Sequence, residues 1–324
     1  MGNSTHITTI ILSGYIEIGN IKYFCFTILT LLFVAVLVAN QLLIVVICRE
    51  SSLHEPMYVF LCSLSVNDVY GSIAVFPLLL SNMLLSKPPE ISLTLCHVQI
   101  FALYTYGSVE FSNLAVMSYD RYVAICYPLE YHRIMSPTRI VTLIALVWLI
   151  LMIKFSINLF LNAQLQLCGN VLDKVYCDNY MLAKLSCSET TANNTTGIIG
   201  IMLSIFAPLG IILFSYTKIL RVCSKYTRET KQKAVSTCVP HFVSLLNFSV
   251  GCSFEIIQSR FDKLPMPPVL RVILSIYFLI CPPLVNPIMY GIRLSKIKRA
   301  IKKCIFHSVW IKPLIKIRML FIVI

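Results

Sequence analysis

Residues 24–47 read FCFTILTLLFVAVLVANQLLIVVI, and this stretch contains no charged side chain. A helix of about 20 apolar residues crosses the hydrocarbon layer of a bilayer and satisfies its own backbone hydrogen bonds there. Residues 24–47 therefore predict a transmembrane helix, and six further stretches have the same character. The seven predicted spans are 24–47, 58–85, 96–123, 140–160, 198–219, 236–257 and 272–290.

The composition also indicates a protein that lies mostly in a membrane. Of the 324 residues, 57% are hydrophobic and only 13% are charged, and the mean hydropathy is +0.80, which excludes an ordinary soluble domain. Seven spans and their loops leave no room for a separate globular catalytic domain. The predicted fold is an all-α seven-transmembrane helix bundle at 24–291, with an outer N-terminus at 1–23 and a cytosolic tail with a short amphipathic helix at 292–324.

Basic residues are distributed unevenly, and they predict the orientation of the chain. The formal net charge is +13, from 27 Lys and Arg against 14 Asp and Glu. Nineteen of the 27 lie in or beside the loops after the first, third and fifth spans, or in the C-terminal tail. Because such basic loops stay in the cytosol, we expect an extracellular N-terminus. The positive charge indicates membrane topology rather than nucleic-acid binding.

Glycosylation sequons agree with this orientation. Asn3, Asn193 and Asn194 each begin an Asn-x-Ser/Thr sequon on the predicted outer side, where the modifying enzyme acts. Asn247 also begins a sequon, but it lies in the sixth span and we expect it to stay unmodified. The first 23 residues show no uninterrupted apolar core, so we expect the first span to serve as an uncleaved signal-anchor.

Four of the 13 cysteines lie on the predicted outer side. Cys96 begins the third span, and Cys168, Cys177 and Cys187 lie in the long loop before the fifth span. Because the outer face is oxidising, we interpret them as two disulfides. Four cysteines allow three connectivities, and the sequence does not choose among them.

An Asp–Arg pair stands at the cytosolic end of the third span, in the run MSYDRYVAICYP at 117–128. Such a pair can hold the cation against its neighbour in one state and release it in another. The alternative is an interfacial anchor, in which Arg121 reaches the lipid headgroups. Charge alone favours the anchor.

The run at 117–128 resembles the MAYDRYVAICxPLxY signature of vertebrate odorant receptors, which are rhodopsin-like G-protein-coupled receptors. Three further segments match in the same order. PMYVFLCSLSVND at 56–68 resembles PMYxFLxxLSxxD, KAVSTCVPH at 233–241 resembles KAxSTCxxH, and PLVNPIMY at 283–290 resembles PxxNPxxY. Together these motifs cover about residues 20–305, and their joint match is highly specific.

The resemblance implies disulfides, a polar network and a coupling element. The implied disulfides are Cys96–Cys177 and Cys168–Cys187. A buried network of polar side chains would link the ligand cavity to the cytosolic face, although simple hydrogen-bonding between helices is the alternative. The network residues are Asn40, Asp68, Glu110, Asn286 and Tyr290. The implied G-protein coupling and switch residues are Asp120, Arg121, Tyr122, Tyr216 and His241, with Asn286, Pro287 and Tyr290 of the seventh span.

The resemblance also implies a small-molecule cavity between the outer halves of spans three, five, six and seven. Its lining would be small, hydroxyl-bearing or aliphatic, and therefore mostly apolar. Ordinary helix packing is the alternative for each position. The implied ligand-binding residues are Leu103, Tyr104, Gly107, Ser108, Gly200, Ile201, Ser204, Cys252, Ser253 and Ile256.

Three charged residues near this region are candidate ligand contacts, because an ionisable group inside a membrane must find a partner. Lys154 lies inside the fourth span, Glu255 near the outer end of the sixth, and Arg260 at the outer mouth. Arg260 is a candidate contact for a carboxylate ligand, since its guanidinium matches that group, or else an interfacial anchor. Lys154 and Glu255 are alternatively expected to neutralise each other.

Two places depart from the family pattern. Residues 247–250 read Asn-Phe-Ser-Val where many relatives have Phe-Tyr-Gly, so we expect an aromatic contact at the cavity floor to be missing. Pro240, just before His241, is unusual and is expected to bend the sixth helix. Prolines at 208, 282, 283 and 287 are also expected to kink the fifth and seventh spans.

The implied function is an odorant receptor in the plasma membrane of olfactory cilia. Its partners would be a small-molecule odorant, membrane lipid and a stimulatory, olfactory-type heterotrimeric G protein that raises cyclic AMP. The alternatives are a non-olfactory G-protein-coupled chemoreceptor for a small carboxylate or amine, and a small-solute transporter, although seven spans do not divide into two similar halves. The spans show no catalytic or metal-binding group, so we expect no enzyme activity, cofactor or metal.

Overall fold

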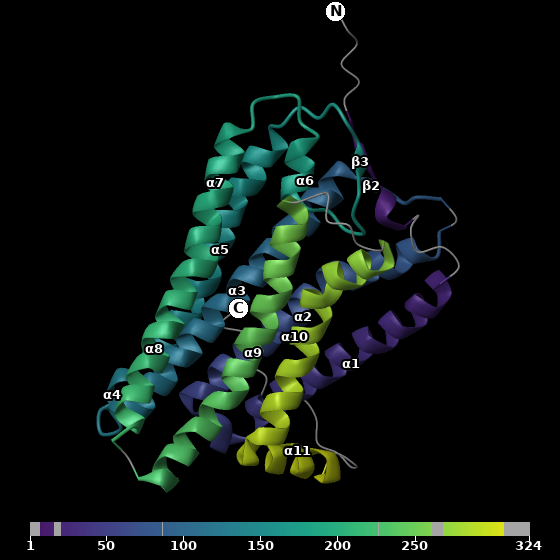
Figure 1. Ribbon diagram of the computed structural model, residues 1–324. Coiled ribbons are helices and arrows are strands. Elements are labelled where there is room, and N and C mark those ends of the chain that lie inside the picture. The colour runs from purple at the N-terminus through teal and green to yellow at the C-terminus, as the bar shows by residue number, and fades with distance from the viewer. Residues whose placement is uncertain (1–6, 16–20, 86, 226, 261–267, 308–324) are drawn as a thin grey trace, which may run out of the picture.

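The computed structural model describes residues 7–15, 21–85, 87–225, 227–260 and 268–307 (Figure 1). Long helices form one bundle, and short strands lie at the end of the bundle nearest the N-terminus. The helices are α1 (Lys22–Arg49), η2 (Ser51–Leu53), α2 (Pro56–Met83), α3 (Leu93–Cys126), α4 (Tyr131–Ile134), α5 (Pro137–Ala163), α6 (Asn179–Lys184), α7 (Thr191–Ile201), η3 (Met202–Phe206), α8 (Ala207–Cys223), α9 (Arg228–Arg260), α10 (Pro268–Arg293) and α11 (Ser295–His307). The strands are β1 (Thr9–Leu12), β2 (Glu90–Ser92) and β3 (Val171–Leu172).

Five helical elements of the described residues are long and apolar enough to cross a membrane. They are α1, α2, α5, the continuous run from α7 through η3 to α8, and α10. Helix α3 packs against α2, α5, α8 and α9, so its polar side chains, such as Glu110 and Asn113, face protein and are buried. Helix α9 begins with the charged sequence RETKQK.

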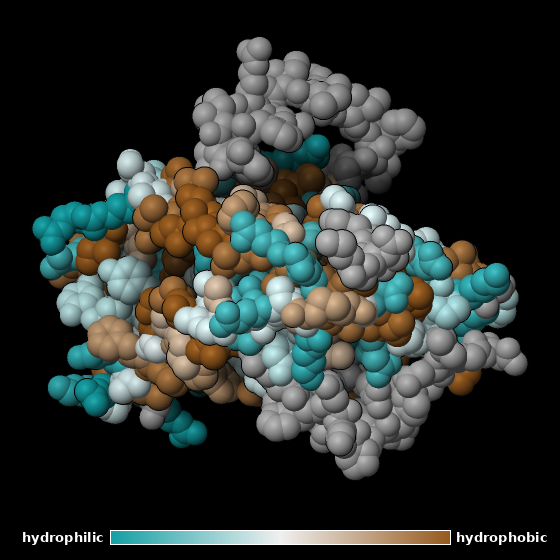
Figure 2. All heavy atoms as spheres, turned by 90° about the horizontal axis from the view of Figure 1, so that it is seen from above, coloured by the Kyte–Doolittle hydropathy of each residue, from teal (hydrophilic) through white to brown (hydrophobic). Residues whose placement is uncertain are grey.

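Apolar side chains of the outer helices point away from the bundle. Leu31 on α1, Ile153 on α5 and Leu213 on α8 are 66%, 62% and 68% exposed. Seen from above, hydrophobic side chains reach the surface beside hydrophilic ones (Figure 2). Such exposure is expected of helices whose outer faces meet lipid.

The prolines of α10 leave backbone carbonyls without helical partners, and side chains of other helices bind them. Pro287 lacks the N–H that would bond the Pro283 carbonyl, and Asn40 of α1 donates to that carbonyl at 2.7 Å. Pro282 likewise frees the Phe278 carbonyl, to which the Tyr106 hydroxyl of α3 donates at 3.3 Å. Side chains of α1 and α3 therefore supply the hydrogen bonds that these two carbonyls of the seventh span lose at the prolines.

Pro208 lies at the junction of two kinds of helix. The preceding turn, η3, is π-helical, and Pro208 stands in the first turn of α8, where its missing N–H is tolerated. This wide turn contains Ser204, which is 4% exposed and faces a cavity inside the bundle.

A small sheet covers the outer end of the bundle. Strand β1 pairs antiparallel with β2 and parallel with β3, although the sequence predicted only an outer segment at 1–23. The Tyr15 hydroxyl donates to the Val175 carbonyl at 2.8 Å, and burial raises the pKa of this phenol. A Cβ on Gly14 would lie 2.8 Å from the Lys174 carbonyl carbon, so glycine permits this close approach. The N-terminal segment therefore holds the loop after α5 in place through strand pairing and a side-chain hydrogen bond.

Replacing Gly71 with alanine is expected to destabilise the bundle by about 1–3 kcal/mol. The new Cβ would lie 2.4 Å from the Tyr106 ring, and this ring is fully buried, so it has no space to move. The thermal unfolding midpoint of the purified chain measures the effect. Gly210→Ala in α8 is the matched control, because a Cβ at Gly210 would meet no atom within 4 Å; equal loss in both variants would contradict the packing argument.

Candidate ligand site and coupling motif

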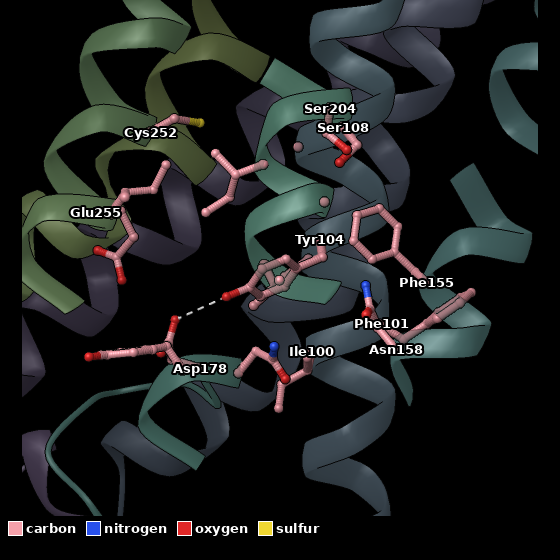
Figure 3. A pocket seen from close by; sticks show the side chains of 18 of the residues that line it. Ile100, Phe101, Tyr104, Ser108, Phe155, Asn158, Asp178, Ser204, Cys252 and Glu255 are labelled. Atoms are coloured by element: carbon pink, nitrogen blue, oxygen red, sulfur yellow. Dashed lines mark hydrogen bonds between the residues drawn. The ribbon is translucent and has the colours of Figure 1, made fainter. Parts of the chain in front are cut away.

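A cavity of about 180 Å³ lies between α3, α5, α7, η3 and α9, and residues 176–180 of the loop after α5 close its outer end (Figure 3). Below, this space is called the ligand cavity. Nine of the predicted ligand-binding residues line it: Leu103, Tyr104, Gly107, Ser108, Gly200, Ile201, Ser204, Cys252 and Ile256.

Of the two remaining predicted ligand-binding residues, one lies outside the lining and the other has no described side chain. Ser253 is exposed and is absent from the lining. It follows Cys252, and consecutive residues of an α-helix point about 100° apart, so only Cys252 faces the cavity. Arg260 is the last residue of α9, and its side chain lies outside the described residues.

Residues 247–250 place one aromatic side chain, Phe248, below the cavity, and the expected loss of a second aromatic contact there stays a prediction. Phe248 is fully buried, and its ring lies 4.9 Å from that of Phe111 and 6.0 Å from that of Tyr106. This ring joins α9 to α3 under the ligand cavity.

The loop above the cavity is joined to α3. The structure contains both implied disulfides, Cys96–Cys177 and Cys168–Cys187. Cys177 also donates its backbone N–H to the Gln99 side-chain oxygen at 2.9 Å. Its neighbours Tyr176 and Asp178 both line the cavity, so the first disulfide places them at the outer end.

The two ionisable residues expected to neutralise each other do not form a pair. Glu255 pairs instead with Lys174 of the loop, at 2.7 Å. Lys154 donates to the Gly200 carbonyl at 2.9 Å and to the Ser204 hydroxyl. Its ammonium also lies 4.4 Å from the centre of the Phe155 ring. The alternative of a Lys154–Glu255 pair is therefore wrong, because α7 and η3 supply neutral partners for Lys154 that the sequence did not reveal.

Sequence reasoning also missed several lining residues. Phe101, Phe155, Asn158, Tyr176 and Asp178 all line the cavity. Tyr176 and Asp178 carry a usable signal, because they flank the cysteine implied to bind the top of the third span. The others lack such a signal, since apolar helices give no direct indication of which face meets a cavity.

At the cytosolic end of α3, Arg121 is bound by its neighbour. Its Nε donates to Asp120 Oδ2 at 2.9 Å, and Asp120 is fully buried. Tyr131 of α4 donates its hydroxyl to Asp120 Oδ1 at 2.7 Å. Burial and the Asp120 carboxylate raise the pKa of Tyr131. Tyr131 is the last residue of the signature, but no role was assigned to it from the sequence.

Other predicted switch residues lie in or near this motif. The Tyr216 hydroxyl lies 2.6 Å from His241 Nδ1, which joins α8 to α9, while Tyr122 lies beside Tyr127, with hydroxyls 3.3 Å apart. Pro240 is accommodated inside α9.

The predicted polar network is centred on one amide. The Asn286 side-chain nitrogen donates to Asp68 at 3.1 Å and to Glu110 at 2.9 Å. Asn67, which the sequence did not single out, donates to the second Glu110 oxygen at 2.9 Å. These four side chains are at most 1% exposed, and Tyr290 is buried as well. The network therefore joins α2, α3 and α10 in the middle of the bundle.

The predicted glycosylation positions differ in accessibility. Asn193 lies in α7 and donates its amide to the Asn162 side chain at 2.8 Å, so it is half-buried. Asn194 is exposed. Asn3 lies outside the described residues. Asn247 lies in α9, and its side-chain oxygen accepts a hydrogen bond from the Tyr277 hydroxyl at 2.5 Å.

Comparison with known proteins places this arrangement in a family. The family model for olfactory receptors matches residues 29–308. Olfactory receptor 4B13 of Mus musculus is 34% identical over 93% of this chain and 97% of its own length. Olfactory receptor 2G6 of Homo sapiens is 35% identical over 92% and 94%, and olfactory receptor 11A1 of Homo sapiens is 32% identical over 93% and 95%.

A solved structure shows the same fold. Squid rhodopsin superposes with a TM-score of 0.73 at 19% sequence identity, covering 89% of this chain and 86% of its own. The predicted all-α, seven-transmembrane class is thereby confirmed. From the family match and the curated relatives, the chain belongs to the olfactory receptor family.

Proposed function

We propose that the chain binds a small odorant in the ligand cavity and activates a stimulatory, olfactory-type G protein, which raises cyclic AMP. Its family makes it a membrane receptor that acts through a G protein, and not an enzyme. We place it in the plasma membrane of olfactory cilia, as its family suggests.

The observation that carries this proposal is the layout of α3. Tyr104 and Ser108 stand at the cavity, Glu110 lies in the buried network, and the Asp120–Arg121 pair lies at the cytosolic end. A ligand that moves α9 through the Phe248 contact would change the packing around all three positions. The site residues thus lie on one continuous helix from ligand to coupling motif.

The test is a second-messenger assay on cells that display the full chain. A panel of acids, amines, alcohols and amino acids is applied, and we expect at least one class to raise cyclic AMP above that of cells without the receptor. Uptake of the same labelled compounds is measured in parallel. Uptake without any G-protein signal would favour a transporter and overturn the proposal.

A further inference from the structure

We infer that the outer end of the ligand cavity is built to bind a protonated amine. This inference rests on the proposed use of the cavity as the odorant site. It is carried by two buried carboxylates that face the same space and, among the described residues, have one buried cation beside them.

The carboxylates come from different parts of the chain. Glu255 is on α9 and Asp178 is the N-cap residue of α6, and both line the cavity. They are 8% and 6% exposed, while Lys174 is 5% exposed. Figure 3 shows Glu255 and Asp178 approaching the same region near Tyr104. Among the described residues, these two negative charges and one positive charge leave the buried region with an excess negative charge, which is costly without a further cation.

Both carboxylates keep acceptor capacity. Lys174 binds Glu255 Oε1, whereas Oε2 accepts no hydrogen bond within the described residues. The Tyr176 hydroxyl lies within hydrogen-bonding reach of Glu255 and 3.3 Å from the Ser275 carbonyl. Asp178 accepts the Met181 N–H at 2.9 Å as a helix cap, and its other oxygen lies 3.5 Å from the Tyr104 hydroxyl. An ammonium group carries the donor that Glu255 Oε2 lacks, and Asp178 can accept a further hydrogen bond from the same group.

The surrounding walls favour the same ligand. Tyr104, Phe155 and Tyr176 line the cavity, with the first two rings 6.0 Å apart. Aromatic faces attract ammonium groups, most strongly where water is excluded. A carboxylate ligand would meet two like charges at this end.

The inner end of the cavity carries no carboxylate among the described lining residues and has a lysine behind it, and this difference between the two ends orients an amine ligand. The Lys154 ammonium lies behind Ser204 and donates to its hydroxyl, so the Ser204 proton remains available to the cavity. Ser108 lines the wall beside it (Figure 3). An amine with an apolar body would therefore place its nitrogen outward, toward Glu255 and Asp178.

The experiment uses the full chain in cells and primary amines from butylamine to octylamine, each paired with the alcohol and the carboxylate of the same length. We expect the amines to be the most potent series. Glu255→Gln and Asp178→Asn should each lower amine potency by about tenfold or more, because each removes a charge-assisted contact. Asparagine retains helix-capping ability at position 178.

Two further variants control for charge and folding. Glu90→Gln removes an exposed carboxylate on the same outer face and should leave amine potency unchanged. If Glu255→Gln fails to reach the surface because Lys174 is left unpaired, the double change Lys174→Gln with Glu255→Gln removes both charges. This double variant should reach the surface and still show the lower amine potency.

Binding is also measured without signalling, as thermal stabilisation of the purified chain by hexylamine. Stabilisation that is lost in Glu255→Gln supports the amine site even if no second messenger rises, and that outcome would overturn only the proposed function. Signalling by alcohols or carboxylates with weaker amines, or amine potency unchanged in both single variants at normal surface levels, would overturn the amine site. If no compound of any series raises cyclic AMP or stabilises the purified chain, both the amine site and the proposed function are overturned.

Discussion

Replacing Arg121 with alanine is expected to abolish the G-protein response to any agonist of this receptor. The guanidinium is held by Asp120 at the cytosolic end of α3, and its proposed role requires a positive charge that can leave this partner and meet the G protein. Alanine provides no such charge. Cyclic AMP at saturating agonist, normalised to receptor at the cell surface, measures the loss.

Stability must be separated from coupling, because the single change leaves Asp120 buried without its cation. Removing one partner of a buried pair typically costs about 3–5 kcal/mol. The double change Asp120→Asn with Arg121→Ala removes both charges and should restore the surface level while the response stays absent. A double variant that signals like the parent chain would contradict the coupling role of Arg121.

Long-range patterns made much of the fold predictable. Spans are read from hydropathy alone, because a lipid-facing helix must be apolar over its whole length. Six predicted spans fall in single long helices, although the second runs past the end of α2 at Met83, and the fifth falls in the continuous run from α7 through η3 to α8. The Asp120–Arg121 contact was also predictable, because the two residues are adjacent and share one helix end.

Contacts between distant segments could not be predicted in the same way. Lys174 and Glu255 are separated by 81 positions, and their pairing depends on where the loop folds over the bundle. The fourth span offered Lys154 as an equally plausible cation, but η3 and α7 provide its partners. Strand β1 was missed because four residues, TIIL, carry too short a pattern to identify a strand whose partners lie in other loops.

Breaking the Cys96–Cys177 disulfide is expected to lower the surface level of the receptor and its agonist response more than breaking Cys168–Cys187 does. It joins positions 81 residues apart, against 19 for Cys168–Cys187. A chain-entropy estimate gives about 4.5 kcal/mol for the first loop and about 3 kcal/mol for the second, as upper values because helices already restrict the reduced chain. Cys96 and Cys177 are also fully buried, so their loss disturbs packing as well.

The difference should be larger for ligand response than for expression, because only the first bridge adjoins the cavity. Cys177 lines the cavity between Tyr176 and Asp178, whereas Cys168 and Cys187 are exposed. Paired serine variants, Cys96→Ser with Cys177→Ser and Cys168→Ser with Cys187→Ser, avoid leaving a free thiol. Surface labelling and agonist potency are compared for both pairs. Equal or greater loss in the second pair would show that the position of the loop over the cavity does not depend mainly on Cys96.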